Sequence, residues 1–174
     1  SKAKAVNFGI AYGQGAFGLS QNLNIPRKEA KEIIDSYFAK YPKVKEYMDE
    51  SIAMARENGY CKTIMDRVLR LRDINSANHM VRSQAERIAI NAPIQGSAAD
   101  IVKVAMINVD RFLKQSDFNT KMLLQVHDEL VFDVPMEELE TITPIIEKLM
   151  SEAFKLDVPL VVDSGTGENW LQAH

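Results

Sequence analysis

The sequence is short of cysteine and of long apolar runs. It has one cysteine, Cys61, among 174 residues, so no disulfide can form within the chain and a reducing compartment is indicated. No apolar run approaches the roughly 20 residues of a membrane-spanning helix, and no signal-peptide pattern opens the chain. These missing features disfavour a disulfide-stapled fold and a membrane-spanning one. The first residue is not Met and a helical pattern already runs at residue 2, so we expect a piece of a longer chain.

An excess of charge of one sign is also missing, because the formal net charge is −3. That value argues weakly against nucleic-acid binding, but the local distribution of charge matters more than the total. Between Lys62 and Arg87 there are six basic and three acidic residues, whereas acids are concentrated between Asp128 and Asp157. The chain therefore has one basic and one acidic segment despite its small net charge.

A short antiparallel hairpin is predicted where two apolar runs, Leu123–Val126 and Leu130–Val134, flank a polar centre of His127, Asp128 and Glu129. Hairpin turns favour glycine or asparagine, which tolerate positive φ, so an imidazole and two adjacent carboxylates are unusual there. Two neighbouring acids repel each other and are partly desolvated between apolar strands. A divalent cation such as magnesium would offset that cost. The alternative is a solvated acidic turn.

Residues 2–12 have the pattern of a helix that stops at Gly13. Lys4, Phe8 and Tyr12 recur every four residues and therefore share one face of this helix. An ammonium group followed by two aromatic rings could hold a triphosphate and stack a base. The alternative is a core stripe of Phe8 and Tyr12, with Lys4 in solvent.

Arg87, Asn91 and Gln95 also recur every four residues, here across a predicted break at Asn91-Ala92-Pro93. Side chains of these types can donate to base edges in a minor groove, where the acceptors differ little between sequences. Ordinary capping and turn chemistry around Pro93 is the alternative.

The remaining segments predict an α+β fold that is mostly helical, with short antiparallel strands. The expected helices and strands follow from apolar periodicity and from Pro, Gly and Asn at their ends. They are helices over Arg27–Lys40, from Pro42 to Asn58, from a cap at Asn75 to Ile90, over Ile94–Lys114 and over Met136–Phe154, with strands at Tyr60–Ile64, Val68–Leu71 and Val158–Asp163.

Taken in order, these segments resemble the C-terminal part of a family A, or DNA polymerase I type, DNA polymerase. The resemblance covers essentially all 174 residues. It is carried by Lys4–Gly13, similar to the fingers helix called motif B; by Val126–Leu130, similar to motif C of the palm; by Ala85–Asp100 between them; and by the ending Gly167–His174. It implies a helical fingers region over residues 1–74 with a short β segment at its end, and a partial palm over residues 75–174.

The resemblance implies nucleotidyl transfer: a primer 3′-hydroxyl attacks the α-phosphate of a dNTP between two magnesium ions. Primer–template DNA and dNTPs would be the partners, in DNA replication or repair. The implied catalytic residues are Asp128, which is also the metal ligand, and Glu129 in a supporting role. The implied dNTP-binding residues are Lys4, Phe8 and Tyr12. The implied DNA-binding residues are Arg87, Asn91, Gln95 and His127.

The chain departs from the family pattern in three places. The arginine that usually stands four residues before the motif B lysine, here Lys4, would fall just before Ser1 and is missing. Motif A, which supplies the other metal-binding aspartate, is not in this sequence, so we expect no polymerisation by the chain alone. The segment Thr63–Ile74 has Asp66-Arg67-Val68 and Arg70-Leu71-Arg72 where the family often has Gly-Arg-Arg and a later Tyr-x-Pro. Without the motif A strand, the hairpin would keep an open edge beside apolar side chains. We therefore expect self-association, or shielding of that edge by the C-terminal segment.

Two other functions stay open from the residues alone. A metal-dependent phosphodiesterase could use Asp128 and Glu129, although it would need further acids or histidines nearby. A nucleic-acid-binding module without catalysis would need neither carboxylate. A cytoplasmic location of the bacterial type is expected, and an organelle would also fit.

Overall fold

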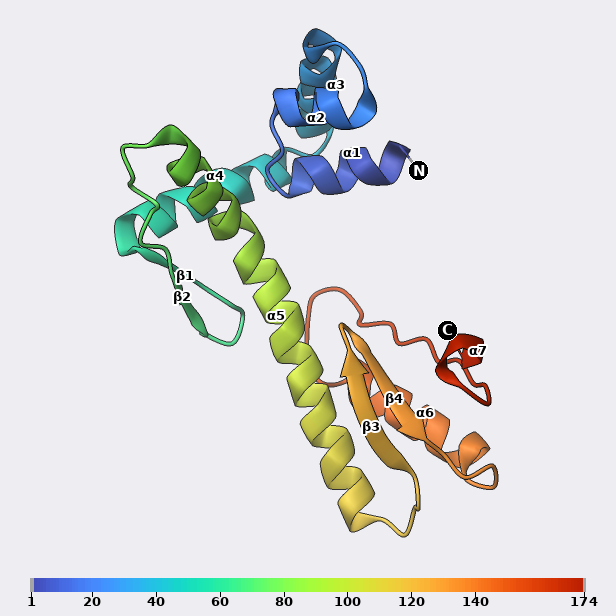
Figure 1. Cartoon of the computed structure of the whole chain (residues 1–174). Coiled ribbons are helices and arrows are strands. Elements are labelled where there is room, and N and C mark those ends of the chain that lie inside the picture. Colours follow the sequence, from blue (N-terminus) through green and yellow to red (C-terminus); the bar gives the residue numbers. More distant parts are fainter. Residues whose placement is uncertain (1, 174) are drawn as a thin grey trace. The chain divides into compact units, whose positions relative to one another are not determined.

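The computed structural model describes residues 2–173, which form two compact units that divide between Ser97 and Ala98. The chain is mostly helical and has two small antiparallel sheets (Figure 1), which confirms the predicted α+β class. The predicted C-terminal motif ends at residue 174, outside the described residues. Within those residues, no helix combines the length and apolar character needed to cross a membrane.

The first unit contains four helices, one two-stranded sheet and the beginning of a long fifth helix. Its elements are α1 (Lys2–Ala11), α2 (Ala16–Leu23), α3 (Arg27–Lys40), α4 (Pro42–Asn58), β1 (Tyr60–Lys62), β2 (Val68–Arg70) and the first part of α5 (His79–Gln115). One buried cluster joins α1, α2 and α3 through Ile10, Leu19 and Ala30. A second joins α4 to the segment after β2 and to α5, through Ala55, Leu71, Ile74, Ala85 and Ala89.

The ends of the helices follow from local backbone chemistry. Pro42 occupies the first turn of α4, where a missing N–H costs nothing. Gly59 closes α4 with a φ of +74°, and Asn24 closes α2 with a φ of +53°. The predictions for Arg27–Lys40 and for the helix from Pro42 to Asn58 are confirmed.

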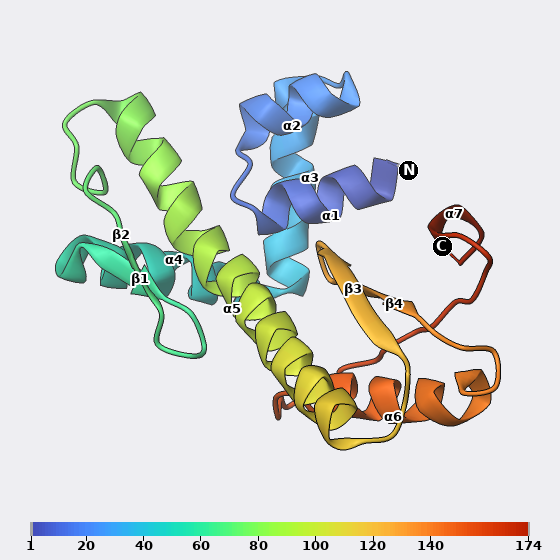
Figure 2. The ribbon, with the colours of Figure 1, turned by 60° about the horizontal axis from the view of Figure 1, so that its bottom comes forward.

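The second unit contains the last part of α5 and a hairpin that packs on a further helix. Its remaining elements are β3 (Lys121–Val126), β4 (Glu129–Asp133), α6 (Leu139–Ser151) and α7 (Trp170–Ala173). Val109 of α5 is buried with Ile142 and Ile146 of α6, and Phe132 of β4 packs against this cluster. Figure 2 shows α6 beside the hairpin. The hairpin prediction is confirmed.

The predicted break at Asn91-Ala92-Pro93 is wrong, because α5 continues through Pro93 as one helix of 37 residues. Proline removes one N–H donor and crowds the preceding turn. Side-chain hydrogen bonds reach the helix carbonyls next to it. The Tyr47 hydroxyl donates to the carbonyl of Ile90 at 2.9 Å, and Oγ of Ser97 donates to the carbonyl of Pro93.

Two further predictions are corrected by the structure. The helix starts at His79 rather than near Asn75, because Oδ1 of Asn78 accepts the N–H of Met80 at 2.9 Å and acts as the cap. Residues 158–163 form no strand, since the described strands β3 and β4 pair only with each other. The second region, residues 75–174, therefore has one long helix where two were expected and lacks the C-terminal strand. The division at residue 74 itself stays a prediction, since the compact units meet inside α5.

Candidate functional site

Lys4 and Phe8 lie on one exposed face of α1, and Tyr12 continues that face in the turn directly after the helix, as their spacing predicts. Nζ of Lys4 is 5.8 Å from the centre of the Phe8 ring, and the ring centres of Phe8 and Tyr12 are 5.7 Å apart. Phe8 is 49% exposed and Tyr12 is 37% exposed. This face therefore offers a cation and two accessible rings, which suit a phosphate group and a base.

The opposite side of α1 supplies its apolar contacts. Ile10 is 1% exposed and is buried with Leu19 and Ala30, and Val6 packs against the same cluster. Since this core forms without Phe8 or Tyr12, the core-stripe interpretation of the two rings is disfavoured. Their nucleotide-binding role stays a prediction.

Gly13 brings the end of α1 against α5. Its φ is +79°, a conformation that glycine adopts without steric cost. A β-carbon at this position would lie 3.3 Å from Cδ1 of Ile90 and 3.6 Å from Cγ of Arg87. The close approach places the nucleotide-binding candidates of α1 in the same unit as the DNA-binding candidates of α5.

Asn91 connects these two segments directly. Its Nδ2 donates a long hydrogen bond of 3.5 Å to the carbonyl of Tyr12, whereas its Oδ1 is buried with no partner among the described residues. A buried acceptor without a donor costs about 1–3 kcal/mol. Arg87 and Gln95, four residues before and after, are exposed. Because α5 is unbroken, all three side chains belong to one helical face.

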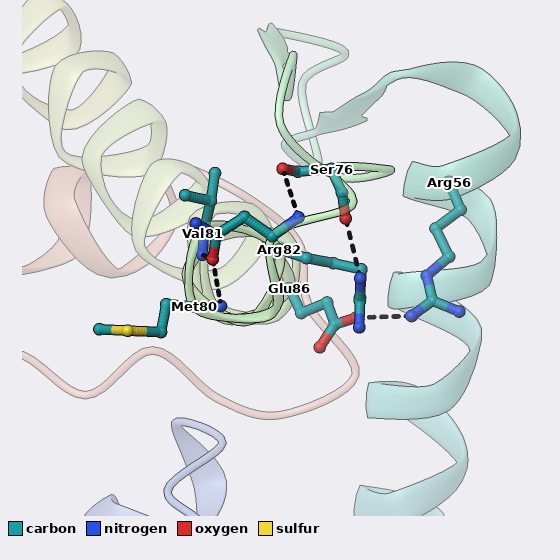
Figure 3. A network of polar contacts seen from close by, with 7 residues as sticks. Arg56, Ser76, Met80, Val81, Arg82 and Glu86 are labelled. Carbon is teal, nitrogen blue, oxygen red and sulfur yellow. Dashed lines mark hydrogen bonds and ion pairs between the residues drawn. The ribbon is translucent and has the colours of Figure 1, made fainter.

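An ion-pair network holds the beginning of α5 against α4 (Figure 3). Oε1 of Glu86 accepts a hydrogen bond of 2.5 Å from Nη2 of Arg56 and lies 3.8 Å from Nε of Arg82. Nη1 of Arg82 also donates to the carbonyl of Ser76 at 2.8 Å. Isolated surface pairs contribute little, but a network restricts the rotation of a helix more effectively. Here it fixes the turn that presents the neighbouring Arg87.

The tip of the β1–β2 hairpin packs on α5 beside Ser97. The backbone N–H of Ile64 donates to Oγ of Ser97 at 2.8 Å. Oγ1 of Thr63 accepts the N–H groups of Met65 and Arg67, which fixes its rotamer. Gly96 leaves room for this side chain, because a β-carbon there would lie 2.6 Å from Cγ2 of Thr63.

In the second unit, the predicted catalytic residues lie at the turn of the β3–β4 hairpin. Val126 pairs with Glu129, so His127 and Asp128 form a two-residue turn. His127 has a φ of +54°, and its carbonyl accepts a hydrogen bond of 2.7 Å from Nε2 of Gln125. The side chain of Gln125 thus stabilises a turn whose first residue is not the usual glycine.

The carboxylates at this turn differ in exposure. Asp128 is exposed, and its side chain makes no hydrogen bond or ion pair with the described residues, whereas Glu129 is half-buried as the first residue of β4. In the described part of the chain, no three His, Cys, Asp or Glu side chains are grouped closely enough to hold a metal ion. The turn therefore offers oxygen ligands for part of a metal site.

Glu138 fixes the start of the hairpin. Its carboxylate accepts hydrogen bonds from the N–H groups of Asn119 and Thr120 at 2.7 and 2.9 Å, and from Oγ1 of Thr120 at 2.7 Å. Desolvation acts to raise the pKa of Glu138, but these donated hydrogen bonds outweigh it and hold the pKa below its usual 4.5. The charged form therefore stabilises the segment that leads into β3.

Sequence reasoning missed the residues that support the site. Ser97 lies four residues after Pro93, a spacing that could have suggested the bond to the proline carbonyl. Tyr47 is 43 residues from Ile90, so no local sequence pattern could have predicted the hydrogen bond between them. The positive φ of Gly13 was suggested only by its place at the end of a helix.

Comparison with known families gives one match over almost the whole chain. The profile described as DNA polymerase family A matches residues 1–172. DNA polymerase I of Lactococcus lactis subsp. lactis is 53% identical over 98% of this chain, and that of Streptococcus pneumoniae serotype 4 is also 53% identical over 98%. DNA polymerase I of Geobacillus stearothermophilus is 51% identical over 99%. The chain spans only 20% of the length of each of these relatives.

A solved structure agrees with this match. The POL domain of Pol1 from M. smegmatis, in complex with DNA primer-template and dNTP, is 45% identical, with a TM-score of 0.96. The match covers 99% of this chain and 30% of that one.

Proposed function

The chain belongs to DNA polymerase family A, and on this basis we propose that it contributes to template-directed DNA synthesis within a longer protein. The observation that carries the proposal is the likeness to a polymerase domain bound to primer-template and dNTP, with a TM-score of 0.96 over 99% of this chain. Replication and repair are the processes such a protein would serve. We also propose the bacterial cytoplasm as its location.

Within this proposal, the exposed face of α1 binds the dNTP. The ammonium group of Lys4 contacts the triphosphate, since it lies at one end of a face that carries no competing carboxylate. Phe8 packs against the sugar and base, and Tyr12 lies at the templating position. Both rings are accessible for these roles, with 49% and 37% exposure.

Primer–template DNA is proposed to contact α5 and the hairpin turn. Arg87, Asn91 and Gln95 would meet the duplex through its backbone and minor groove, where hydrogen-bond donors are useful at any sequence. His127 would contact the primer strand from the turn. Arg87 and Gln95 support a ligand at this face, because both side chains are exposed.

Magnesium is the proposed cofactor, with two ions in the intact enzyme. This cation takes oxygen ligands and is commonly held by one or two carboxylates together with substrate phosphates. Asp128 fits that requirement, because its carboxylate is exposed and makes no hydrogen bond or ion pair with the described residues. Asp128 would hold the ion and Glu129 would support it. When bound, magnesium would neutralise phosphate charge and activate the attacking hydroxyl.

Two finer proposals concern the isolated chain. We propose that it extends no primer, because the described residues group fewer than three potential metal ligands. We also propose that it self-associates through the hairpin, where Leu123 and Leu124 are 57% and 50% exposed. Detectable template-directed incorporation by the pure 174-residue chain would contradict the first of these.

The main proposal is tested in a polymerase that contains this chain. Asp128→Ala should remove most primer extension and leave the unfolding transition unchanged. Asp133→Ala is the matched control, because Asp133 is an exposed acid at the other end of β4. Near-normal turnover of the Asp128→Ala enzyme would show that this carboxylate is not the metal ligand.

Lys4→Ala should raise the apparent KM for dNTPs, lower kcat, or both, by about 2–4 kcal/mol in total.

A further inference from the structure

A groove in the first unit lies outside the proposed catalytic and DNA-binding residues. Its volume is about 560 Å³, within the range of ligand sites. The segment after β2 forms one wall and the beginning of α5 forms the other. The lining residues are Arg70, Leu71, Arg72, Asp73, Met80, Val81, Gln84, Ala85 and Ile88.

The α5 wall is an exposed apolar stripe. Met80, Gln84 and Ile88 recur every four residues and share one face of the helix, and Val81 lies beside them. Met80 is 81% exposed, Val81 38% and Ile88 36%. Figure 3 shows Met80 pointing away from the ion-pair network of Glu86. Gathered apolar side chains of this kind are typical of a surface that binds a partner.

The other wall begins at the open edge of β2 and continues into the turn that follows Leu71. The N–H of Leu71 donates to Gly59 and the carbonyl of Arg67 accepts from Thr63, so these positions of the β2 strand face β1. By alternation, the backbone groups of Val68 and Arg70 point outward. Among the described residues, no strand pairs with this outer edge. Such an edge is a template for an added strand.

Two arginines determine which charge the groove accepts. The side chains of Arg70 and Arg72 are exposed and form no ion pair with the described residues. Leu71 between them is 5% exposed and packs with Ala85 of α5, so alternation places the side chain of Arg70 on the opposite face of β2. Arg72 is exposed in the turn that follows. The single acid in the lining, Asp73, leaves a net positive wall.

From these features we propose that the groove binds an extended peptide whose residues alternate between apolar and acidic. The peptide adds a strand to the outer edge of β2, through the main-chain hydrogen bonds that such additions use. Its apolar side chains face the stripe on α5, and its carboxylates face Arg70 and Arg72. Single-stranded nucleic acid is disfavoured, because none of the nine lining residues is aromatic and bases would find no stacking platform.

The test uses a fluorescein-labelled hexapeptide that alternates glutamate and leucine, with fluorescence anisotropy on the 174-residue chain. Saturable binding should weaken at least about tenfold in R70E/R72E. The control K103E/K155E changes net charge equally at exposed sites in the second unit and should bind normally. A lysine–leucine hexapeptide should bind R70E/R72E better than the original chain, which shows that the variant is folded and that charge sets the preference.

Two further arms test the groove and the edge. Met80→Glu should weaken binding, whereas Met136→Glu, at a methionine of matched 80% exposure, should not. A hexapeptide N-methylated on alternate residues should fail to bind, because it cannot pair with the strand. Equal binding of the N-methylated peptide, or no effect of R70E/R72E, would overturn the proposal. The proposal would also be overturned if oligothymidine bound more tightly than the peptide and lost its binding in R70E/R72E. The groove would then be a nucleic-acid-binding surface.

Discussion

At the scale of single residues, Gly13 has both a positive φ and close neighbours. We predict that Gly13→Ala lowers the free energy of unfolding by about 1–3 kcal/mol, because an alanine would combine left-handed strain with contact against Ile90. Gly59 is the matched control, since its φ of +74° is similar and a β-carbon there would have no atom within 4 Å. Gly59→Ala should cost about 1 kcal/mol. Urea unfolding gives both values, and equal losses would show that Ile90 moves aside.

Residue-level patterns predicted the candidate site only in part. The four-residue spacing of Lys4, Phe8 and Tyr12 gave their shared face, because helix geometry alone determines it. That Asp128 and Glu129 are neighbours at the hairpin turn could also be read directly from the sequence. The contact of Asn91 with the Tyr12 carbonyl joins residues 79 positions apart, and only the tertiary fold could reveal it.

At the scale of elements, the β1–β2 hairpin fits against α5 because residue 96 is glycine. We predict that Gly96→Ala is destabilising by about 1–3 kcal/mol, since the new methyl group would overlap the methyl group of Thr63. Thr63→Ser keeps the oxygen that accepts two N–H groups and removes that methyl. The double variant should therefore recover most of the loss.

The check is a double-mutant cycle from chemical unfolding of the four proteins. A coupling energy near zero between positions 63 and 96 would mean that the hairpin tip moves away from α5 without cost.

Glu138 makes the start of the β3–β4 hairpin sensitive to acid. Its folded pKa lies below its usual 4.5, so its contribution to stability is complete above that value and is lost as the pH falls through the folded pKa. Glu138→Gln should therefore destabilise the chain at pH 7, and the difference from the original should shrink below pH 4.5. Unfolding free energies measured from pH 3 to 7 give this profile. A difference that is constant with pH would assign the effect to packing.

The elements that sequence reasoning missed depend in part on distant partners such as Tyr47. Pro93 predicted a break from local backbone chemistry, but Tyr47 and Ser97 bind the carbonyls around it and the helix continues. Residues 158–163 have the composition of a strand, yet a strand needs a hydrogen-bonded neighbour. Capping and periodicity were sufficient for α3 and α4, where the decisive residues are local.

At the scale of the whole molecule, the hairpin predicts association between copies of the chain. The outer edges of β3 and β4 pair with no described strand, and Leu123 and Leu124 are exposed. We expect the weight-average mass from light scattering to rise with concentration. Leu124→Lys should suppress the rise, because an edge lysine opposes strand pairing. Val161→Lys, at a site of 79% exposure outside any helix or strand, is the control. A constant monomer mass would contradict self-association, and rapid solvent exchange of the Leu123–Val126 amides would also contradict shielding of this edge by the C-terminal segment.

The fold class was predictable because it depends on the proportions of helical and alternating patterns. The division into compact units was not, since it falls between Ser97 and Ala98, inside a segment predicted as one continuous helix from Ile94 to Lys114.

The turn at His127 has a consequence for engineering. Its φ of +54° is one that glycine adopts freely and that a residue with a β-carbon adopts at a cost of about 1–2 kcal/mol. Mutant libraries screened only for heat resistance should therefore enrich glycine or asparagine at this position. Variants from such a screen would lack the imidazole beside Asp128. Under the primer contact proposed for His127, heat resistance and nucleotide incorporation by the parent polymerase would change in opposite directions at this position.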